Sequence, residues 1–242
     1  MDVTPASVLC YLRSMPLRAV IYDLDGTLVD SRQDLVDAVN ATLARLQLAP
    51  LPAPLIASFV GEGAELLVRR SLSAARRRDG RGDEPPDQLP SAAVAGAMPI
   101  WRESYGARLL VHTRAYPGIE ALLAETPDRR GVLTNKPGGF ARSILEGLGL
   151  LPRFARVVGG DEAPRKPAPD GLLALCASLG VAPAEALLVG DSPVDIGCAR
   201  AAAVRCCAVA WGFAGRDQLV AAAPDHLCES PAEVAALLGR LR

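Results

Sequence analysis

The sequence has few aromatic residues, only 4% of its 242, and no run close to the roughly 20 apolar residues that a membrane-spanning helix needs. It also lacks an excess of charge of either sign, because 26 basic residues nearly balance 27 acidic ones. Without a basic excess there is no field that would attract nucleic acid or an anionic membrane surface. We therefore expect a small-molecule partner, and neither nucleic acid nor a membrane.

Cysteine patterns typical of metal sites and disulfides are missing as well. The six cysteines include no C-x-x-C pair, and no histidine stands at zinc-ligand spacing. Cys206 and Cys207 are adjacent in an expected strand, so their side chains should point to opposite faces and not pair with each other. Residues 1–18 lack the basic start and long apolar core of a secretion signal, and Met15 is an alternative start. These features predict reduced thiols in a cytoplasmic protein.

What the sequence does contain is typical of a globular α/β protein. Half of its residues are hydrophobic and 22% are charged. Short apolar runs at 18–23, 131–134, 155–158, 186–189 and 206–209, with 225–228 as an edge, alternate with stretches of helical spacing. This alternation predicts a Rossmann-like parallel sheet with right-handed crossovers.

The interval 33–112 breaks the alternation. It shows helical spacing over 34–48, 63–75 and 92–109 and no convincing strand. Residues 76–87 are rich in charge, glycine and proline and predict an exposed loop, whose interleaved acids argue against phosphate binding by its arginines. We predict an α/β core of residues 15–31 and 113–242 with an inserted all-helical cap of residues 32–112.

Two acidic residues, Asp23 and Asp25, stand where the first expected strand ends. Open α/β sheets bind ligands at the carboxyl ends of their strands. Side chains two apart in an extended segment share a direction, so these carboxylates would repel each other unless a divalent cation lay between them. Such a pair alone more often belongs to a turn or a helix cap. Its interpretation therefore depends on the residues at the ends of the other strands.

Polar residues follow further expected strands. Thr134 and Asn135 offer a hydroxyl and backbone amides to a phosphate just before a helix, although either residue could instead only cap that helix. Lys166 lies in a proline-stiffened loop, where a lysine is usually just solvated. Asp191 and Asp195 add an acidic pair of the oxygen ligands that Mg²⁺ prefers.

These four segments, in this order, resemble the four motifs of the haloacid dehalogenase superfamily. The expected helical insertion falls between the first and second motifs, where one subgroup carries its cap. Segments 60–63, 133–137, 159–161 and 166–170 look most like the phosphoglycolate phosphatase branch. The sequence departs from that branch in two places: it has alanines at 201–203, where the branch often has glycine, and its cap loop is rich in arginine. Both departures leave the catalytic chemistry intact and bear on the identity of the substrate.

The resemblance implies a magnesium-dependent phosphomonoester hydrolase that works through an aspartyl-phosphate intermediate on a small phosphorylated metabolite, with 2-phosphoglycolate as a candidate. It implies that Asp23 is the nucleophile and Asp25 the general acid and base. Thr134 and Asn135 are implied to bind phosphoryl oxygens, and Lys166 to neutralise both Asp23 and the phosphate.

The implied Mg²⁺ ligands are Asp23, the backbone carbonyl of Asp25 and Asp191, with Asp195 in support. In the cap, the turn formed by Gly61, Glu62 and Gly63 is a candidate for substrate selection, while Glu62 is equally well explained as a helix-terminal acid. These further assignments complete the set of expected site residues.

Alternative functions share the same core. A sugar-phosphate mutase of the β-phosphoglucomutase kind, a pyrophosphatase and a non-catalytic binding protein all remain as alternatives. Asp25 favours phosphoryl transfer over dehalogenation, because attack at carbon with loss of halide needs no such acid. The intact set of five core residues (Asp23, Asp25, Thr134, Lys166 and Asp191) argues against a non-catalytic role.

Overall fold

The computed structural model describes residues 15–126 and 129–242. Residues 1–14, which include Cys10 and most of the segment expected to lack a secretion signal, lie outside the described residues. None of the described helices combines the length and low charge that crossing a bilayer requires.

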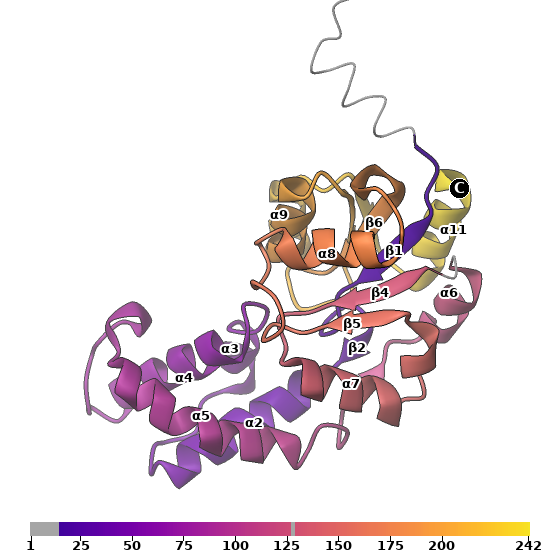
Figure 1. Ribbon diagram of the computed structural model, residues 1–242. Helices are drawn as coiled ribbons and strands as arrows, with labels where there is room; N and C mark the ends of the chain where they lie inside the picture. The colour runs from indigo at the N-terminus through magenta and orange to yellow at the C-terminus, as the bar shows by residue number, and fades with distance from the viewer. Residues whose placement is uncertain (1–14, 127–128) are drawn as a thin grey trace, which may run out of the picture.

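Six parallel strands form the central sheet in the order β5-β4-β1-β6-β7-β8 (Figure 1). Every residue of the central strands β1, β6 and β7 is buried, because helices cover both faces, and this explains their continuous apolar runs. The predicted parallel α/β class is confirmed. The strands are β1 (Ala19–Tyr22), β4 (Arg130–Leu133), β5 (Arg156–Val158), β6 (Ala186–Gly190), β7 (Arg205–Val209) and β8 (His226–Cys228).

The two faces of the sheet pack into separate hydrophobic cores. In β1, Val20 and Tyr22 enter one core and Ala19 and Ile21 the other, as the alternation of side chains in a strand requires. Cys207 and Cys206 are divided between the same two cores. The first face is covered by α6 (Ile119–Glu125), α7 (Gly138–Gly147) and α11 (Pro231–Leu241), and the second by α8 (Asp170–Ser178), α9 (Pro193–Ala201) and α10 (Arg216–Ala221); η2 (Leu151–Arg153) and η3 (Pro183–Glu185) are short connections.

A module of helices between β2 and β3 packs around a third core of its own. Figure 1 shows it beside the sheet, in the purple and magenta part of the ribbon. Trp101 and Tyr105 are buried in this core with their rings stacked at 5.2 Å. The module consists of α2 (Arg32–Arg45), α3 (Ala53–Ala57), α4 (Ala64–Arg78), η1 (Pro86–Gln88) and α5 (Ser91–Gly106).

The predicted loop at 76–87 is wrong at its start, because α4 continues through Arg78. Arginine is a good helix former, and cations in a last turn interact favourably with the helix dipole. Arg76 and Arg77 are further held by ion pairs to Glu84 and Asp83 in the segment that follows. The irregular part of the stretch thus begins only after the three arginines.

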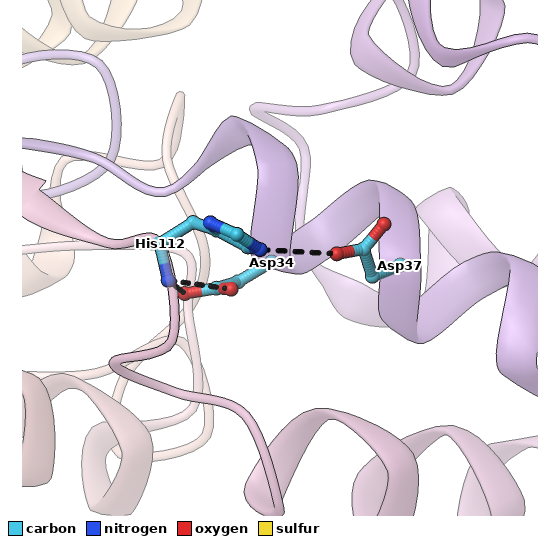
Figure 2. A group of neighbouring side chains, drawn as sticks. All are labelled: Asp34, Asp37 and His112. Atoms are coloured by element: carbon cyan, nitrogen blue, oxygen red, sulfur yellow. Dashed lines mark hydrogen bonds and ion pairs between the residues drawn. The ribbon is translucent and has the colours of Figure 1, made fainter.

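The chain enters and leaves the helical module through a two-stranded antiparallel sheet, β2 (Val29–Asp30) with β3 (Arg114–Ala115). Beside it, the buried carboxylate of Asp34 accepts a 3.0 Å hydrogen bond from the His112 amide (Figure 2). It also accepts bonds from the Thr113 amide at 2.8 Å and the Thr113 hydroxyl at 2.7 Å. Asp37 lies 3.8 Å from the His112 ring. These bonds occupy the Asp34 carboxylate and link the segment that enters the module to the segment that leaves it.

Candidate active site

A cavity of about 430 Å³ lies between the carboxyl edge of the sheet and the helical module. Its core side is lined by residues that follow β1, β4 and β6, and its module side by residues of the 57–67 segment and by Trp101. The carboxyl ends of three separate strands therefore meet at one place, as parallel topology requires.

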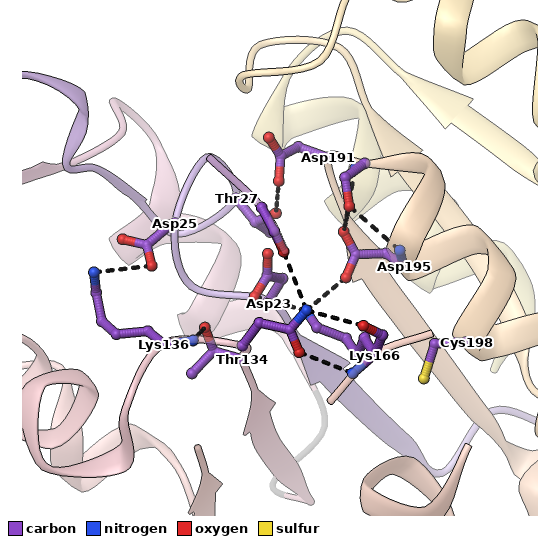
Figure 3. A network of polar contacts seen from close by, with 12 residues as sticks. Asp23, Asp25, Thr27, Thr134, Lys136, Lys166, Asp191, Asp195 and Cys198 are labelled. Carbon is purple, nitrogen blue, oxygen red and sulfur yellow. Dashed lines mark hydrogen bonds and ion pairs between the residues drawn. The ribbon is translucent and has the colours of Figure 1, made fainter. Parts of the chain in front are cut away.

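Asp23 and Lys166 form the centre of the site (Figure 3). The Lys166 ammonium lies 2.8 Å from Asp23 Oδ1 and donates a 2.6 Å hydrogen bond to Asp195 Oδ1. All three side chains are buried. Asp195 Oδ2 in turn accepts bonds from the amide and hydroxyl of Ser192, at 3.1 and 2.5 Å. Lys166 is thus fixed by Asp195 and directed at Asp23.

Asp191 lies on the other side of Asp23 and is held in place by two hydrogen bonds. Its oxygens accept a 2.7 Å bond from the Phe213 amide and a 3.3 Å bond from the Thr27 hydroxyl. Gly26 makes this approach feasible: its φ is +85°, and a Cβ there would meet Asp191 Oδ2 at 2.1 Å. The glycine of the first motif is therefore required both by the turn and by the acid packed against it.

Two carboxylates of this group, Asp23 and Asp191, have a raised pKa, and burial is the main cause. Burial raises the pKa of Asp23 to about 7, against the lowering effect of the Lys166 ammonium, and the Asp195 charge adds to the rise. Burial, followed by the charge of Asp23, also raises the pKa of Asp191 well above its usual range. When ionised, the three carboxylates of this group face a single ammonium, so their negative charge exceeds what Lys166 offsets.

A divalent cation fits this surplus of charge. Carboxylate oxygens of Asp23, Asp191 and Asp195 lie within 4.8 Å of one another. Apart from its ion pair with Lys166, Asp23 Oδ1 has no hydrogen-bond partner among the described residues. Asp195 is already paired with the Lys166 ammonium through Oδ1, whereas the two oxygens of Asp191 accept bonds from neutral donors. Asp23 and Asp191 are consequently the better ligands, with Asp195 in the supporting position.

Asp25 lines the same cavity but faces a different cation. Its Oδ2 lies 3.1 Å from Lys136 Nζ, and its Oδ1 accepts a hydrogen bond from the Ser31 hydroxyl. Figure 3 shows the Asp25–Lys136 pair apart from the group around Asp23. The expected repulsion between Asp23 and Asp25 is thus offset by two separate cations, Lys166 beside Asp23 and Lys136 beside Asp25. The Asp25 carboxylate is not part of the acidic group described above.

Lys136 is the site residue that the sequence analysis did not assign. It lies in the second motif and is buried, with its ammonium 2.7 Å from the Tyr105 hydroxyl and 4.5 Å from the centre of the Tyr105 ring. Burial alone lowers the pKa of Lys136, but the Asp25 charge and the Tyr105 hydroxyl outweigh it and raise the pKa, so the side chain stays charged. Its position directly after the expected phosphate-binding residues is the signal in the sequence that could have identified it as a site residue.

Thr134 and Asn135 both line the cavity, and neither caps the following helix, because the N-cap of α7 is Pro137. The Asn135 amide exchanges two hydrogen bonds with the backbone of Lys166, at 2.8 and 3.0 Å. Its Nδ2 also donates to the Gly61 carbonyl at 3.1 Å. The Asn135 side chain thus connects the second and third motifs with the helical module.

The turn of Gly61, Glu62 and Gly63 lines the cavity from the module side. Glu62 forms a 2.7 Å ion pair with Arg70, and its side chain is half-exposed. The negative charge of this acid is therefore largely balanced within the module.

Residues 20–209 match the family model described as haloacid dehalogenase-like hydrolase. The phosphoglycolate phosphatase of Rhodospirillum rubrum is 46% identical over 200 residues, which cover 81% of this chain and 80% of the relative. That of Nitrosospira multiformis is 42% identical over 208 residues, covering 84% and 88%.

Solved structures share the fold. A crystal structure described as a predicted phosphoglycolate phosphatase from Haemophilus somnus superposes with a TM-score of 0.83 at 27% identity, covering 91% of this chain and 97% of that one. The similarity thus extends over both the sheet and the helical module.

Proposed function

This chain belongs to the haloacid dehalogenase-like hydrolase family and is a phosphatase, and on that basis we propose that it is a Mg²⁺-dependent phosphomonoester hydrolase acting on 2-phosphoglycolate. We also propose a cytoplasmic location, on the cysteine pattern of the sequence. The observation that carries the activity is the position of Asp23, buried at the cavity between the Lys166 ammonium and the Asp191 carboxylate.

In the proposed first half-reaction, a carboxylate oxygen of Asp23 attacks phosphorus while the bond from phosphorus to the leaving alcohol breaks. Asp25, which this step requires to be protonated when the substrate binds, gives its proton to the departing oxygen. Thr134 and the backbone N–H of Asn135 hold phosphoryl oxygens, and Lys166 offsets the charge that would otherwise repel the phosphate from Asp23. The products are the free alcohol and an aspartyl-phosphate.

In the second half-reaction, water attacks the phosphorus of the aspartyl-phosphate and Asp25 takes the proton from that water. The bond between phosphorus and Asp23 breaks, which releases inorganic phosphate and restores the carboxylate. Mg²⁺ would be held by the carboxylates of Asp23 and Asp191 and by the backbone carbonyl of Asp25, with Asp195 in support. When bound, this cation would neutralise charge and polarise the phosphoryl group. Residues 32–112 are proposed to act as a cap that excludes water, with the Gly61–Gly63 turn next to the leaving group.

The test is release of inorganic phosphate from a substrate panel by chelator-treated protein, with and without added Mg²⁺. The panel contains 2-phosphoglycolate, a sugar phosphate, pyrophosphate and an aryl phosphate. We expect Mg²⁺-dependent release with the highest kcat/KM for 2-phosphoglycolate. Absence of release from every substrate would refute a phosphatase, and turnover of the sugar phosphate only with a bisphosphate activator would identify a mutase.

A further inference from the structure

The chain contains only two lysines, Lys136 and Lys166, among its 26 basic residues; all the others are arginine. Both lysines are buried, and each lies beside one of the two aspartates of the first motif. A lysine offers a compact, strongly hydrated point charge, whereas arginine presents a planar fork. The sequence thus keeps lysine only at these two positions of the site.

The two lysines divide the site between them. Lys166 lies between two carboxylates, those of Asp23 and Asp195, and is the cation proposed to act on the phosphate. Lys136 is, within the described part of the chain, the only basic residue that lines the cavity. An anionic group of the substrate other than the phosphate, entering a cavity that already contains several carboxylates, needs a positive partner. Lys136 is the residue placed to supply it.

From these contacts we infer that Lys136 binds the carboxylate of the proposed substrate. This inference rests on the proposed phosphatase function and names the residue that selects the substrate. An ammonium has three protons. The contacts to Asp25 and the Tyr105 hydroxyl account for two, which leaves one for a ligand in the cavity.

The position of Lys136 next to Asp25 suits it to a carboxylate attached close to the leaving oxygen. Asp25, as the acid for the leaving oxygen, must come within about 2.6–3.2 Å of it. Lys136 Nζ lies 3.1 Å from Asp25 Oδ2, so it is close to whatever is attached to that oxygen. A carboxylate one carbon away is within reach of Nζ, whereas Lys166, the cation proposed to act on the phosphate, lies beside Asp23.

The module fixes the ammonium in this position. Tyr105 comes from α5 and is held by stacking on Trp101 and by edge contact with Phe140 at 5.3 Å. A fixed cation binds more strongly than one that must be ordered on binding. The carboxylate site is thus built from both the core and the module, with Glu62 balanced by Arg70 at its edge.

The experiment compares two esters of the same length, 2-phosphoglycolate and 2-hydroxyethyl phosphate, in which a neutral hydroxymethyl group replaces the carboxylate. The readout is the ratio of their kcat/KM values in the wild type, K136M and Y105F. Because both substrates are measured on the same preparation, any unfolded fraction cancels from the ratio.

We expect the wild type to prefer 2-phosphoglycolate and K136M to lose roughly 100-fold of that preference, since losing a buried charged partner has an effect of a few kcal/mol. Y105F keeps the cation and should lose far less. Equal losses on both esters in K136M, or a wild type with no preference, would overturn the inference while phosphatase activity stands. A wild type that hydrolyses neither ester nor an aryl phosphate would instead refute the proposed function.

Discussion

At the scale of single residues, Glu62 and Arg70 set the charge at the edge of the cavity on the module side. Removing the acid in E62Q leaves Arg70 unbalanced and should lower the KM for 2-phosphoglycolate, whereas R70Q should raise it. Because both side chains are partly exposed, each change should stay below about fivefold. Initial rates at low and high salt measure the effect, which screening should shrink. A shift in the same direction for both variants would show that Glu62 does not act through its charge.

Individual site residues were predictable from the sequence where they end a strand. Asp23, Thr134 and Asp191 each follow a continuous apolar run, and parallel topology brings such positions to one edge. The partner of each carboxylate was not predictable. The separate pairing of Asp25 with Lys136 depends on a tyrosine contributed by the module, and no sequence spacing encodes that contact.

At the scale of elements, Asn135 joins the end of β4, the Lys166 loop and the helical module through the bonds described above. N135A should lower the free energy of unfolding by roughly 1–3 kcal/mol, because buried backbone groups lose their partners. It should also lower kcat/KM by about tenfold or more, because Lys166 and the Gly61 turn lose a common support. Urea unfolding and steady-state rates on 2-phosphoglycolate measure the two effects.

Asn40 provides a matched control. Its amide exchanges the same kind of paired bonds with the backbone of Leu51, at 2.9 and 3.1 Å, but inside the module and away from the cavity. N40A should lower stability to a similar extent while kcat/KM changes little. If N40A and N135A reduced activity equally, the effect of Asn135 would be one of stability alone.

Among the elements, long ones with strong patterns were predictable and short ones were not. The core strands and the helices α2, α4 and α5 follow apolar periodicity, because burial on one or both faces requires it. The strands β2 and β3 have two residues each and α3 has five, too short for a periodic signal. They form because the chain must cross between core and module, which is a tertiary constraint.

At the scale of the whole molecule, the acidic site should link metal binding, pH and stability. The pKa of Asp23 is raised from its unfolded value of about 3.9 to about 7 in the folded chain without metal, so the folded state binds more protons between these values. The stability of the metal-free folded chain should therefore fall as the pH rises from the unfolded to the folded pKa of Asp23. Mg²⁺ requires the deprotonated carboxylates and should stabilise most at the upper end.

Thermal unfolding with and without Mg²⁺ measures this link. The gain in Tm should be larger near pH 8 than near pH 5, by about 3 °C or more, since ~1 kcal/mol shifts Tm by roughly 2–4 °C in a chain of this size. D191N should lose most of the gain. An equal or larger gain at the lower pH would argue against a site made of Asp23 and Asp191.

The most direct measurement is turnover of 2-phosphoglycolate by D23N with saturating Mg²⁺, together with calorimetric titration of the same ester. The amide cannot form the phosphoryl bond, so kcat should fall by roughly 10³-fold or more, while binding through Thr134, Lys166 and Lys136 largely survives. Turnover by D23N within tenfold of the wild type would contradict the assignment of Asp23 as the residue that attacks phosphorus.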